Sequence, residues 1–231
     1  ELIDKLYSQN QALNDGVIKN KITSNQFFVL KNGKKSALTF YNKEKDLFSR
    51  VEKINCFGIK PKNAEQAFAM DALTNPDIKL VTIQGVAGTG KTLLSLATAL
   101  SQHHDYHHIF LARPVVPLSN KDIGYSPGDA GAKLNPYMEP LWDNLSYIKN
   151  QFSFDNREYL EIEEMQRMEK IVVCPLAYIR GRSLSNVFFI VDEAQNLTPH
   201  EVKTIISRAG ENTKVVFTGD VFQIDSPYLD T

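Results

Sequence analysis

The chain has 231 residues, of which 42% are apolar, and a formal net charge of −1 at pH 7. This length supports one full-sized hydrophobic core and a small accessory module. A net charge so close to zero excludes a protein that binds nucleic acid through an overall basic field. No apolar run approaches the ~20 residues that a membrane-spanning helix needs, so we expect no membrane partner.

The charge is unevenly distributed along the chain. Residues 1–62 carry twelve Lys or Arg against six Asp or Glu, whereas the remainder carries fourteen against twenty-one. A basic N-terminal segment followed by an acidic domain indicates that the N-terminal segment contacts a polyanion. A solvated, lysine-rich surface explains the same charges more simply, and on this feature alone we favour it.

Two cysteines, Cys56 and Cys174, lie far apart and lack the spacing of a metal site. Both flank apolar residues, as is typical of reduced, buried thiols in a cytoplasmic protein. The sequence starts at Glu1 with neither an initiator methionine nor a signal peptide, and it stops shortly after a predicted strand. We therefore expect a piece of a longer cytoplasmic protein.

The first 55 residues predict a small, mostly β module. Residues 1–13 carry apolar side chains at helical spacing, which predicts a short helix. Residues 26–41 form two strand-like runs around Asn32-Gly33, a dipeptide that favours a tight hairpin turn. After a connector, residues 64–73 have the pattern of an amphipathic helix.

From residue 56 to residue 231 the pattern predicts a second domain. Five short runs are almost continuously apolar, as in strands covered on both sheet faces: 79–84, 108–113, 170–176, 187–193 and 214–220. Helical patterns separate most of them, at 91–102, 134–150, 157–170 and 200–209. The alternation predicts an α/β layered domain with a parallel sheet and right-handed crossovers.

The octad GVAGTGKT fits the phosphate-binding pattern G-x-x-x-x-G-K-[ST] in full, with a predicted strand before it and a helix after it. Its glycines let backbone N–H groups surround a phosphate, and the following helix adds its positive end. We expect Lys91 to reach the β- and γ-phosphates and the Thr92 hydroxyl to ligate Mg²⁺. The predicted nucleotide-binding residues of this stretch are Gly85, Val86, Ala87, Gly88, Thr89, Gly90, Lys91, Thr92 and Leu93.

Two further predicted strands end in polar residues. The run FFIVDE ends in Asp192 and Glu193, and in a parallel sheet the carboxyl ends of the strands face the ligand. Asp192 is expected to hold Mg²⁺, and Glu193 to act as the general base for an attacking water. The run KVVFTGD is followed by Gln223, an amide that could sense the γ-phosphate or orient that water.

A long segment between the second and third predicted strands mixes cations with aromatic side chains, the composition of a groove for single-stranded nucleic acid. These residues are Arg113, Lys121, Tyr125, Lys133, Tyr137 and Trp142. We favour a place in the core for Trp142, and leave Arg113 and Lys121 open between nucleic-acid contact and ordinary surface. The histidine-rich run at 103–108 is more simply a solvated loop than a metal site.

Together these motifs resemble the PhoH-like ATPases, and more narrowly the form in which a PIN ribonuclease domain precedes the ATPase. The resemblance covers residues 55–231, and it rests on an ordered set of motifs. The set comprises AEQAFAMDAL, GVAGTGKT, FLARPVVPLSNKDIGYSPGD, KLNPYMEPLWDNL, YIRGRS, VDEAQNLTPHEVKTIISRAG and VFTGDVFQIDSPYLD.

The resemblance implies a RecA-like P-loop NTPase three-layer sandwich, with the small β module in front. It also implies ATP hydrolysis and an RNA-unwinding role, with single-stranded RNA as a partner, beside an N-terminal PIN domain that this chain lacks. Gln66 matches the adenine-reading glutamine of the family, although from the residues alone it is only a polar side chain near a helix start.

Related motors place ATP between two RecA-like domains, and the second supplies an arginine finger. The sequence contains one such domain, so the missing cation must come from a neighbouring copy or from an internal arginine. The candidates are Arg113, Arg180, Arg182 and Arg208, for which surface salt bridges and nucleic-acid contacts stay equally open. A homo-oligomer, such as a ring, is the hypothesis that follows.

Two other functions stay open. A nucleotide-gated scaffold would use ATP to assemble a ring with little turnover. A P-loop kinase would transfer the γ-phosphate to a small hydroxyl compound, but the Asp192-Glu193 pair favours hydrolysis over that transfer.

Overall fold

The computed structural model describes the chain except for residues 17, 19–21, 116–129, 180, 183 and 225–231, and it describes only the backbone of residues 130–135. The chain divides into two compact units. Unit 1 comprises Glu1–Asn55 with Lys60–Ala72, and unit 2 comprises Cys56–Ile59 with Leu73–Thr231. The chain therefore passes between the units more than once near residue 56, and the bounds 1–55 and 56–231 stay a prediction for the functional domains.

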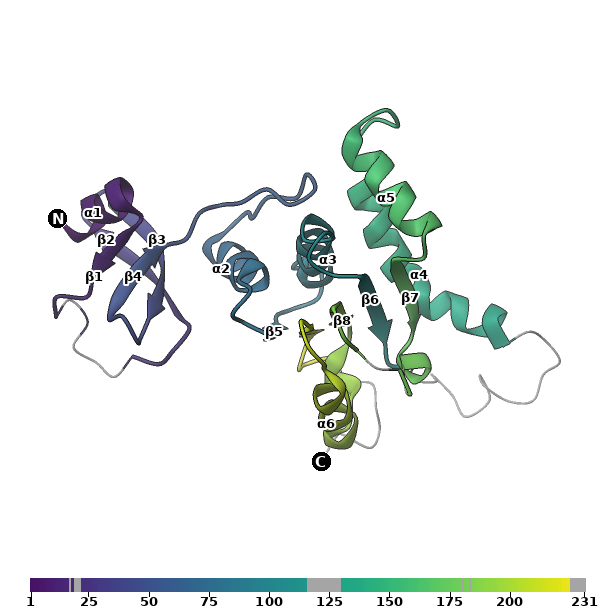
Figure 1. Cartoon of the computed structure of the whole chain (residues 1–231). Coiled ribbons are helices and arrows are strands. Elements are labelled where there is room, and N and C mark those ends of the chain that lie inside the picture. The colour runs from purple at the N-terminus through teal and green to yellow at the C-terminus, as the bar shows by residue number, and fades with distance from the viewer. Residues whose placement is uncertain (17, 19–21, 116–129, 180, 183, 225–231) are drawn as a thin grey trace. The chain divides into compact units, whose positions relative to one another are not determined.

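Unit 1 is built on a four-stranded antiparallel sheet in the order β1-β4-β3-β2. Helix α1, Leu2–Gln9, packs on this sheet (Figure 1). Leu6 of the helix and Phe48 of the sheet are fully buried in its core. The small β module is therefore confirmed. Its strands are β1 Gln11–Leu13, β2 Gln26–Asn32, β3 Lys35–Asn42 and β4 Leu47–Arg50.

The first helix is shorter than predicted. Asn10 adopts a left-handed conformation, with φ 59°, and its N–H donates to the Leu6 carbonyl, which ends the helix. Residues 11–13 then pair with residues 47–49 of β4 as a strand. The helical spacing of residues 1–13 could not reveal this, because the strand depends on a partner more than thirty residues away.

The predicted hairpin is present, with its turn one residue later than expected. Strands β2 and β3 pair so that Asn32 lies opposite Lys35. The two turn residues are therefore Gly33 and Lys34. Gly33 has φ 59°, a conformation that costs glycine little because it has no Cβ.

Helix α2, Ala64–Thr74, confirms the helix predicted at residues 64–73. The Asn63 side chain accepts a hydrogen bond from the Gln66 N–H at 2.8 Å, which satisfies one of the free donors of the first turn. Within unit 1, Phe68 of this helix stacks on Phe27 of β2, with 4.9 Å between the ring centroids.

Unit 2 contains a five-stranded parallel sheet in the order β5-β9-β8-β6-β7. All five predicted strands are present, and the central strand β8 is buried along its whole length. The predicted α/β domain with a parallel sheet is confirmed. The strands are β5 Leu80–Gln84, β6 His108–Arg113, β7 Ile171–Pro175, β8 Val187–Val191 and β9 Lys214–Gly219.

Helices cover both faces of this sheet. In Figure 1, α3, α4 and α5 lie on one side of the strands and α6 lies on the other. The α6 face packs on alternate sheet residues, among them Phe189 and Phe217. The α-helices on this sheet are α3 Lys91–Ser101, α4 Ala130–Lys149, α5 Arg157–Arg167 and α6 Pro199–Arg208. Two short 3₁₀ helices, η1 and η2, span Leu176–Ile179 and Ala194–Asn196.

The core position favoured for Trp142 is wrong. Its side chain is 39% exposed, whereas the neighbouring Leu141 is fully buried. The buried residues of α4 recur at three- and four-residue intervals, at Met138, Leu141, Leu145 and Ile148. Trp142 lies about 100° around the helix from Leu141 and therefore falls beside this stripe.

Strand pairing brings several predicted polar residues to one edge of the sheet. Ala112 of β6 lies opposite Val191 of β8, and the Asp192 N–H donates to the Ala112 carbonyl at 2.8 Å. Gln84 of β5 lies opposite Gly219 of β9. The residues that follow these strands therefore leave the sheet at the same carboxyl-terminal edge, where ligands of such sheets bind.

Two sequence-based expectations concern membrane-spanning helices and the two cysteines. Within the described residues, no helix has both the length and the apolar character needed to cross a membrane. Cys56 and Cys174 are both free thiols, the first buried and the second half-buried. Burial raises the pKa of both thiols.

Candidate nucleotide-binding site

The phosphate loop joins β5 to α3, as predicted. Gly88 and Gly90 have φ of 77° and 83°, and Gly90 is the residue that caps the start of α3. Residues with a Cβ rarely adopt this conformation. The two glycines therefore let the loop turn sharply into the helix and bring its backbone to the helix N-terminus, where an anion is stabilised.

A cleft of about 500 Å³ opens at this loop within unit 2. Such a volume lies in the usual range for small-ligand sites, roughly 300–1,000 Å³. Its walls come from the loop, from α4 and from the ends of β8 and β9. The lining residues are Ala87, Gly88, Gly90, Lys91, Thr92, Leu93, Asp143, Asn144, Tyr147, Asp192, Glu193 and Gly219.

The Lys91 side chain folds back onto the phosphate loop. Its ammonium donates to the carbonyls of Gly85 at 2.7 Å and Val86 at 3.1 Å. Carbonyl oxygens are weaker partners for an ammonium group than phosphate oxygens, because charge-assisted pairs are stronger. Lys91 is therefore held at the cleft by contacts that a phosphate can replace.

The side chains of Thr92 and Asp192 are in contact, although one hundred residues separate them in the sequence. The Thr92 hydroxyl donates to Asp192 Oδ1 at 2.6 Å, and the Thr218 hydroxyl donates to the same oxygen at 2.7 Å. Asp192 is only 7% exposed. The two residues predicted to hold Mg²⁺ thus form one cluster of hard oxygen atoms, the kind of ligand that this ion prefers.

Glu193 has two partners beside the cleft. Arg113 Nη2 donates to its Oε1 at 2.7 Å, and Gln195 Nε2 donates to its Oε2 at 2.5 Å. The Arg113 and Glu193 side chains are 22% and 29% exposed. Glu193 also has a left-handed backbone, with φ 52°. The turn and the two donors together fix the carboxylate at the end of β8.

Gln195 was not singled out by sequence analysis. Besides Glu193, its Nε2 donates to the Gln223 carbonyl at 2.9 Å, and its Oε1 accepts from the Asp220 N–H at 3.1 Å. It fits there because Gly219 has no side chain, since a Cβ on that glycine would lie 2.6 Å from Gln195 Oε1. Its position two residues after Glu193 was visible, but its partners depend on the pairing of β8 with β9.

Asp220 lies against the phosphate loop. Its Oδ2 accepts from the Ala87 N–H at 3.1 Å, its Oδ1 accepts from the Phe222 N–H at 3.0 Å, and the residue is 4% exposed. The loop amide therefore already faces a carboxylate.

Five predicted nucleotide-site residues are not among those that line the cleft: Gly85, Val86 and Thr89 of the loop, Gln223 and Gln66. Gln223 is exposed, and its contact with the site passes through its backbone carbonyl, which accepts from Gln195. Gln66 belongs to unit 1, where its side-chain oxygen accepts from the Lys62 N–H at 2.7 Å. Its role in reading adenine stays a prediction.

The four candidate arginines are in different surroundings. Arg113 contacts Glu193, whereas the Arg182 guanidinium lies 5.9 Å from the centre of the Phe110 ring. Arg208 lines a separate pocket that shares no residue with the phosphate-loop cleft. Arg180 lies outside the described residues, as do Lys121 and Tyr125 of the predicted nucleic-acid segment, and the Lys133 side chain is not described either.

The histidine run at 103–108 lies close to a carboxylate from a distant part of the chain. Folding brings Glu161 of α5 within 4.8 Å of ligand atoms of both His103 and His104. His103 Nδ1 already faces the Leu100 carbonyl at 2.7 Å, and Glu161 accepts from Arg157 at 2.7 Å. These competing partners leave the group without the features of a dedicated metal site.

The chain is similar in sequence to several known proteins. Residues 58–230 match the family described as PhoH-like protein. The chain is 42% identical, over its whole length, to protein PhoH2 of Bacillus subtilis, of which it covers 53%. It is 37% identical over 74% of its length to protein PhoH2 of Thermobispora bispora, covering 38% of that protein. It is also 37% identical over 73% of its length to a PhoH-like protein of Synechocystis, covering 49%. The chain thus spans about half the length, or less, of these curated relatives.

Proposed function

We propose that this chain, which belongs to the PhoH-like protein family and shares its RecA-like P-loop fold, binds ATP and hydrolyses it with Mg²⁺. The observation that carries the proposal is the 2.6 Å contact between Thr92 and Asp192, with Glu193 directly after it. It joins the phosphate loop to the acidic strand end, the two parts that nucleotide hydrolysis requires.

The residues fit a magnesium ion. Thr92 and Asp192 present a hydroxyl and a carboxylate oxygen to one point, and hard oxygen ligands together with phosphate oxygens are what Mg²⁺ takes in nucleotide sites. Bound there, Mg²⁺ would neutralise negative charge on the β- and γ-phosphates. The Thr218 hydroxyl, which donates to the same Asp192 oxygen, would orient the carboxylate.

Side chains and backbone groups of the protein bind the phosphates and activate the attacking water. Lys91 leaves its loop carbonyls and binds the β- and γ-phosphates, and the loop N–H groups surround them. Glu193 accepts a proton from the attacking water. Arg113 and Gln195 hold Glu193 in position and leave the rest of its carboxylate surface for that water.

We further propose that hydrolysis is coupled to remodelling of single-stranded RNA, in a homo-oligomer and beside a PIN nuclease domain of a longer cytoplasmic protein. The excess of lysine and arginine in residues 1–62 supports contact with a polyanion. Arg113 is the described arginine that contacts a cleft residue, and it is already paired. An arginine from a neighbouring copy would complete the site in trans.

The test is the steady-state ATPase rate measured against protein concentration, with and without single-stranded RNA. We expect a rate per protomer that rises with concentration and again with RNA. A flat rate that RNA leaves unchanged would contradict the coupling. ATP-dependent assembly without turnover would favour the nucleotide-gated scaffold, and a requirement for a hydroxyl acceptor would favour a kinase.

A further inference from the structure

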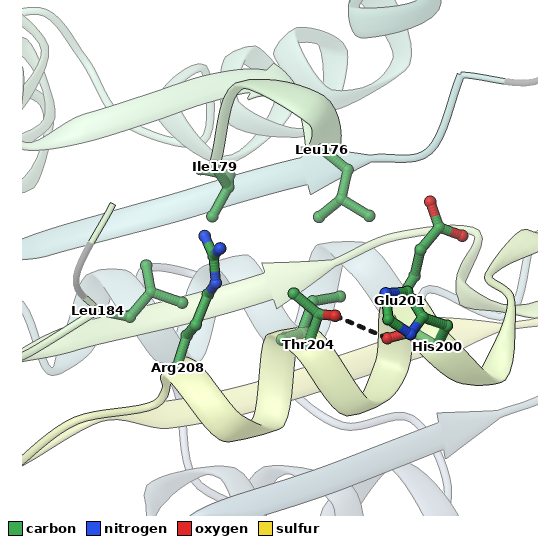
Figure 2. A pocket seen from close by; sticks show the side chains of 8 residues that line it. Leu176, Ile179, Leu184, His200, Glu201, Thr204 and Arg208 are labelled. Atoms are coloured by element: carbon green, nitrogen blue, oxygen red, sulfur yellow. Dashed lines mark hydrogen bonds between the residues drawn. The ribbon is translucent and has the colours of Figure 1, made fainter. Parts of the chain in front are cut away.

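A second pocket of unit 2 lies beside α6, away from the phosphate loop. It encloses about 330 Å³, which is within the roughly 300–1,000 Å³ usual for small-molecule sites. Figure 2 shows α6 along one side and the η1 segment across from it. Its lining residues are Leu176, Ile179, Leu184, His200, Glu201, Thr204, Ile205 and Arg208.

The middle of this pocket is apolar. Leu176, Ile179, Leu184 and Ile205 belong to the main core cluster of the unit, and their side chains form its walls. Such a wall favours the aliphatic or aromatic body of a ligand.

Most polar groups of the pocket are already used. The Thr204 hydroxyl donates to the His200 carbonyl at 2.8 Å, as drawn in Figure 2. The Glu201 carboxylate accepts from the N–H and hydroxyl of Thr198, both at 3.0 Å, and so caps the start of α6. Neither group needs a ligand.

Arg208 is different. Its side chain extends from α6 toward Ile179, with Leu184 beside it (Figure 2). Its Nη1 is buried and has no hydrogen-bond partner, and within the described residues no carboxylate pairs with it. Burying a charged donor without an acceptor is costly, so a native structure normally provides one.

The position of Nη1 limits what can provide that acceptor. Water does not reach this atom, since it is buried, and the side chains of Ile179 and Leu184 lie beside it. A ligand with an apolar body can replace the contacts of those side chains as it enters, and its oxygen atoms can then meet the guanidinium. A carboxylate suits this group best, because its two oxygens match the planar fork of donors.

We propose that this pocket binds a small carboxylic acid, with its apolar body against Leu176, Ile179 and Leu184 and its carboxylate on Arg208. The Glu201 end of the pocket disfavours a second negative charge, since α6 places that residue about 10 Å from Arg208 along the helix axis. The ligand is therefore a monocarboxylate, and its site is separate from the nucleotide cleft.

Calorimetric titration of the whole chain with octanoate tests the proposal, with octanamide as an uncharged ligand of the same shape. Octanoate is expected to bind at one site per chain, with an affinity at least about tenfold higher than that of octanamide, because a charged hydrogen bond is lost in the amide. Arg208→Gln should remove this preference. Lys203→Gln, which removes one positive charge from the same helix outside the pocket, should keep it.

The place of binding can be checked with methyl-labelled protein. Octanoate should shift the NMR signals of Leu176, Ile179 and Leu184 and leave that of Leu93, in the nucleotide cleft, unchanged. Equal affinity for the two ligands, no saturable binding, or an equal loss in Arg208→Gln and Lys203→Gln would overturn the proposal. If Arg208→Gln does not fold, the comparison of the two ligands on the unchanged protein still decides.

Discussion

The phosphate-loop cleft and the α6 pocket of unit 2 both contain charged side chains, but they differ in whether those charges have hydrogen-bond partners. In the cleft, Lys91, Asp192 and Glu193 all have partners at 2.5–3.1 Å. In the pocket, Arg208 Nη1 has none. A cleft whose charges are already paired can exchange those partners for a substrate and recover them after release. A pocket with an unpaired charge gains stability only when something fills it.

The strongest test of this difference is Glu193→Gln. The amide keeps the shape of the side chain and its position beside Arg113, but it cannot accept a proton from water. The ATPase rate constant should fall by about 10²–10⁴-fold, while nucleotide affinity changes little. Phosphate release under saturating ATP measures this effect, with the exposed Glu211→Gln as the control. A Glu193→Gln variant of full activity would remove Glu193 as the base.

Lys91→Met addresses binding in the same cleft. Lys91 exchanges two carbonyl partners for phosphate oxygens, so its loss should weaken ATP binding by about 10–100-fold, the effect of one charged hydrogen bond. The free energy of unfolding without nucleotide should change little, because the Lys91 ammonium contacts only carbonyls of its own loop and one of these two contacts is exposed. A fluorescent nucleotide titration measures the affinity, with Lys203→Met as a control. Unchanged affinity would show that Lys91 does not reach the phosphates.

Lys214 is a buried cation that has its partners, and it allows a direct comparison with Arg208. Its ammonium donates to the Leu73 and Asn75 carbonyls, each at 2.7 Å, and the residue is fully buried. Lys214→Met leaves both carbonyls without this donor and should lower the free energy of unfolding by about 1–3 kcal/mol. Urea denaturation at pH 7 measures the change, and a more stable variant would contradict it.

The same variant has a pH signature. Burial lowers the pKa of Lys214 from 10.5 to about 8. Between these values the unfolded chain binds the proton and the folded chain has released it, so this group adds stability as the pH rises. The stability difference between the unchanged protein and Lys214→Met should therefore grow from pH 8 to pH 10.5. A constant difference across this window would show that the lysine is not desolvated.

Arg208→Met gives the smallest expected effect, and one of opposite sign. It removes a donor that has no acceptor and fills a similar length of apolar space, so the free energy of unfolding should rise by about 1 kcal/mol. Thermal and urea denaturation without added ligand measure it. A loss of stability as large as that of Lys214→Met would show that Arg208 has a partner and would end the contrast between the two regions.

Much of the fold could be predicted because unit 2 is built from local patterns. Continuous apolar runs marked β5 to β9, and the glycine pattern marked the loop before α3. The order β5-β9-β8-β6-β7 could not be predicted, since strand pairing depends on contacts between distant segments. Residues 11–13 were assigned to a helix for the same reason, because the partner that makes them a strand is β4.

The residues of the candidate site also fall into two groups, those that a local motif predicts and those that depend on strand pairing. Lys91, Thr92, Asp192 and Glu193 belong to sequence motifs, so they could be named before the fold was known. The pair of Arg113 with Glu193 arises because β6 lies beside β8, and eighty residues separate the two. Gln195 was missed, because a glutamine after a strand end acquires a role only when the loop after β9 lies next to it.

Gly219 shows how close packing beside the site limits which substitutions a position tolerates. It offers no functional group, yet a methyl group at this position would lie within 2.6 Å of Gln195 Oε1 and displace the amide that joins Glu193 to Asp220 and to the Gln223 carbonyl. In a library of all single substitutions selected for ATPase activity, this position should tolerate as few replacements as Lys91. The position of the proposed general base would then depend, in part, on a residue that has no side chain.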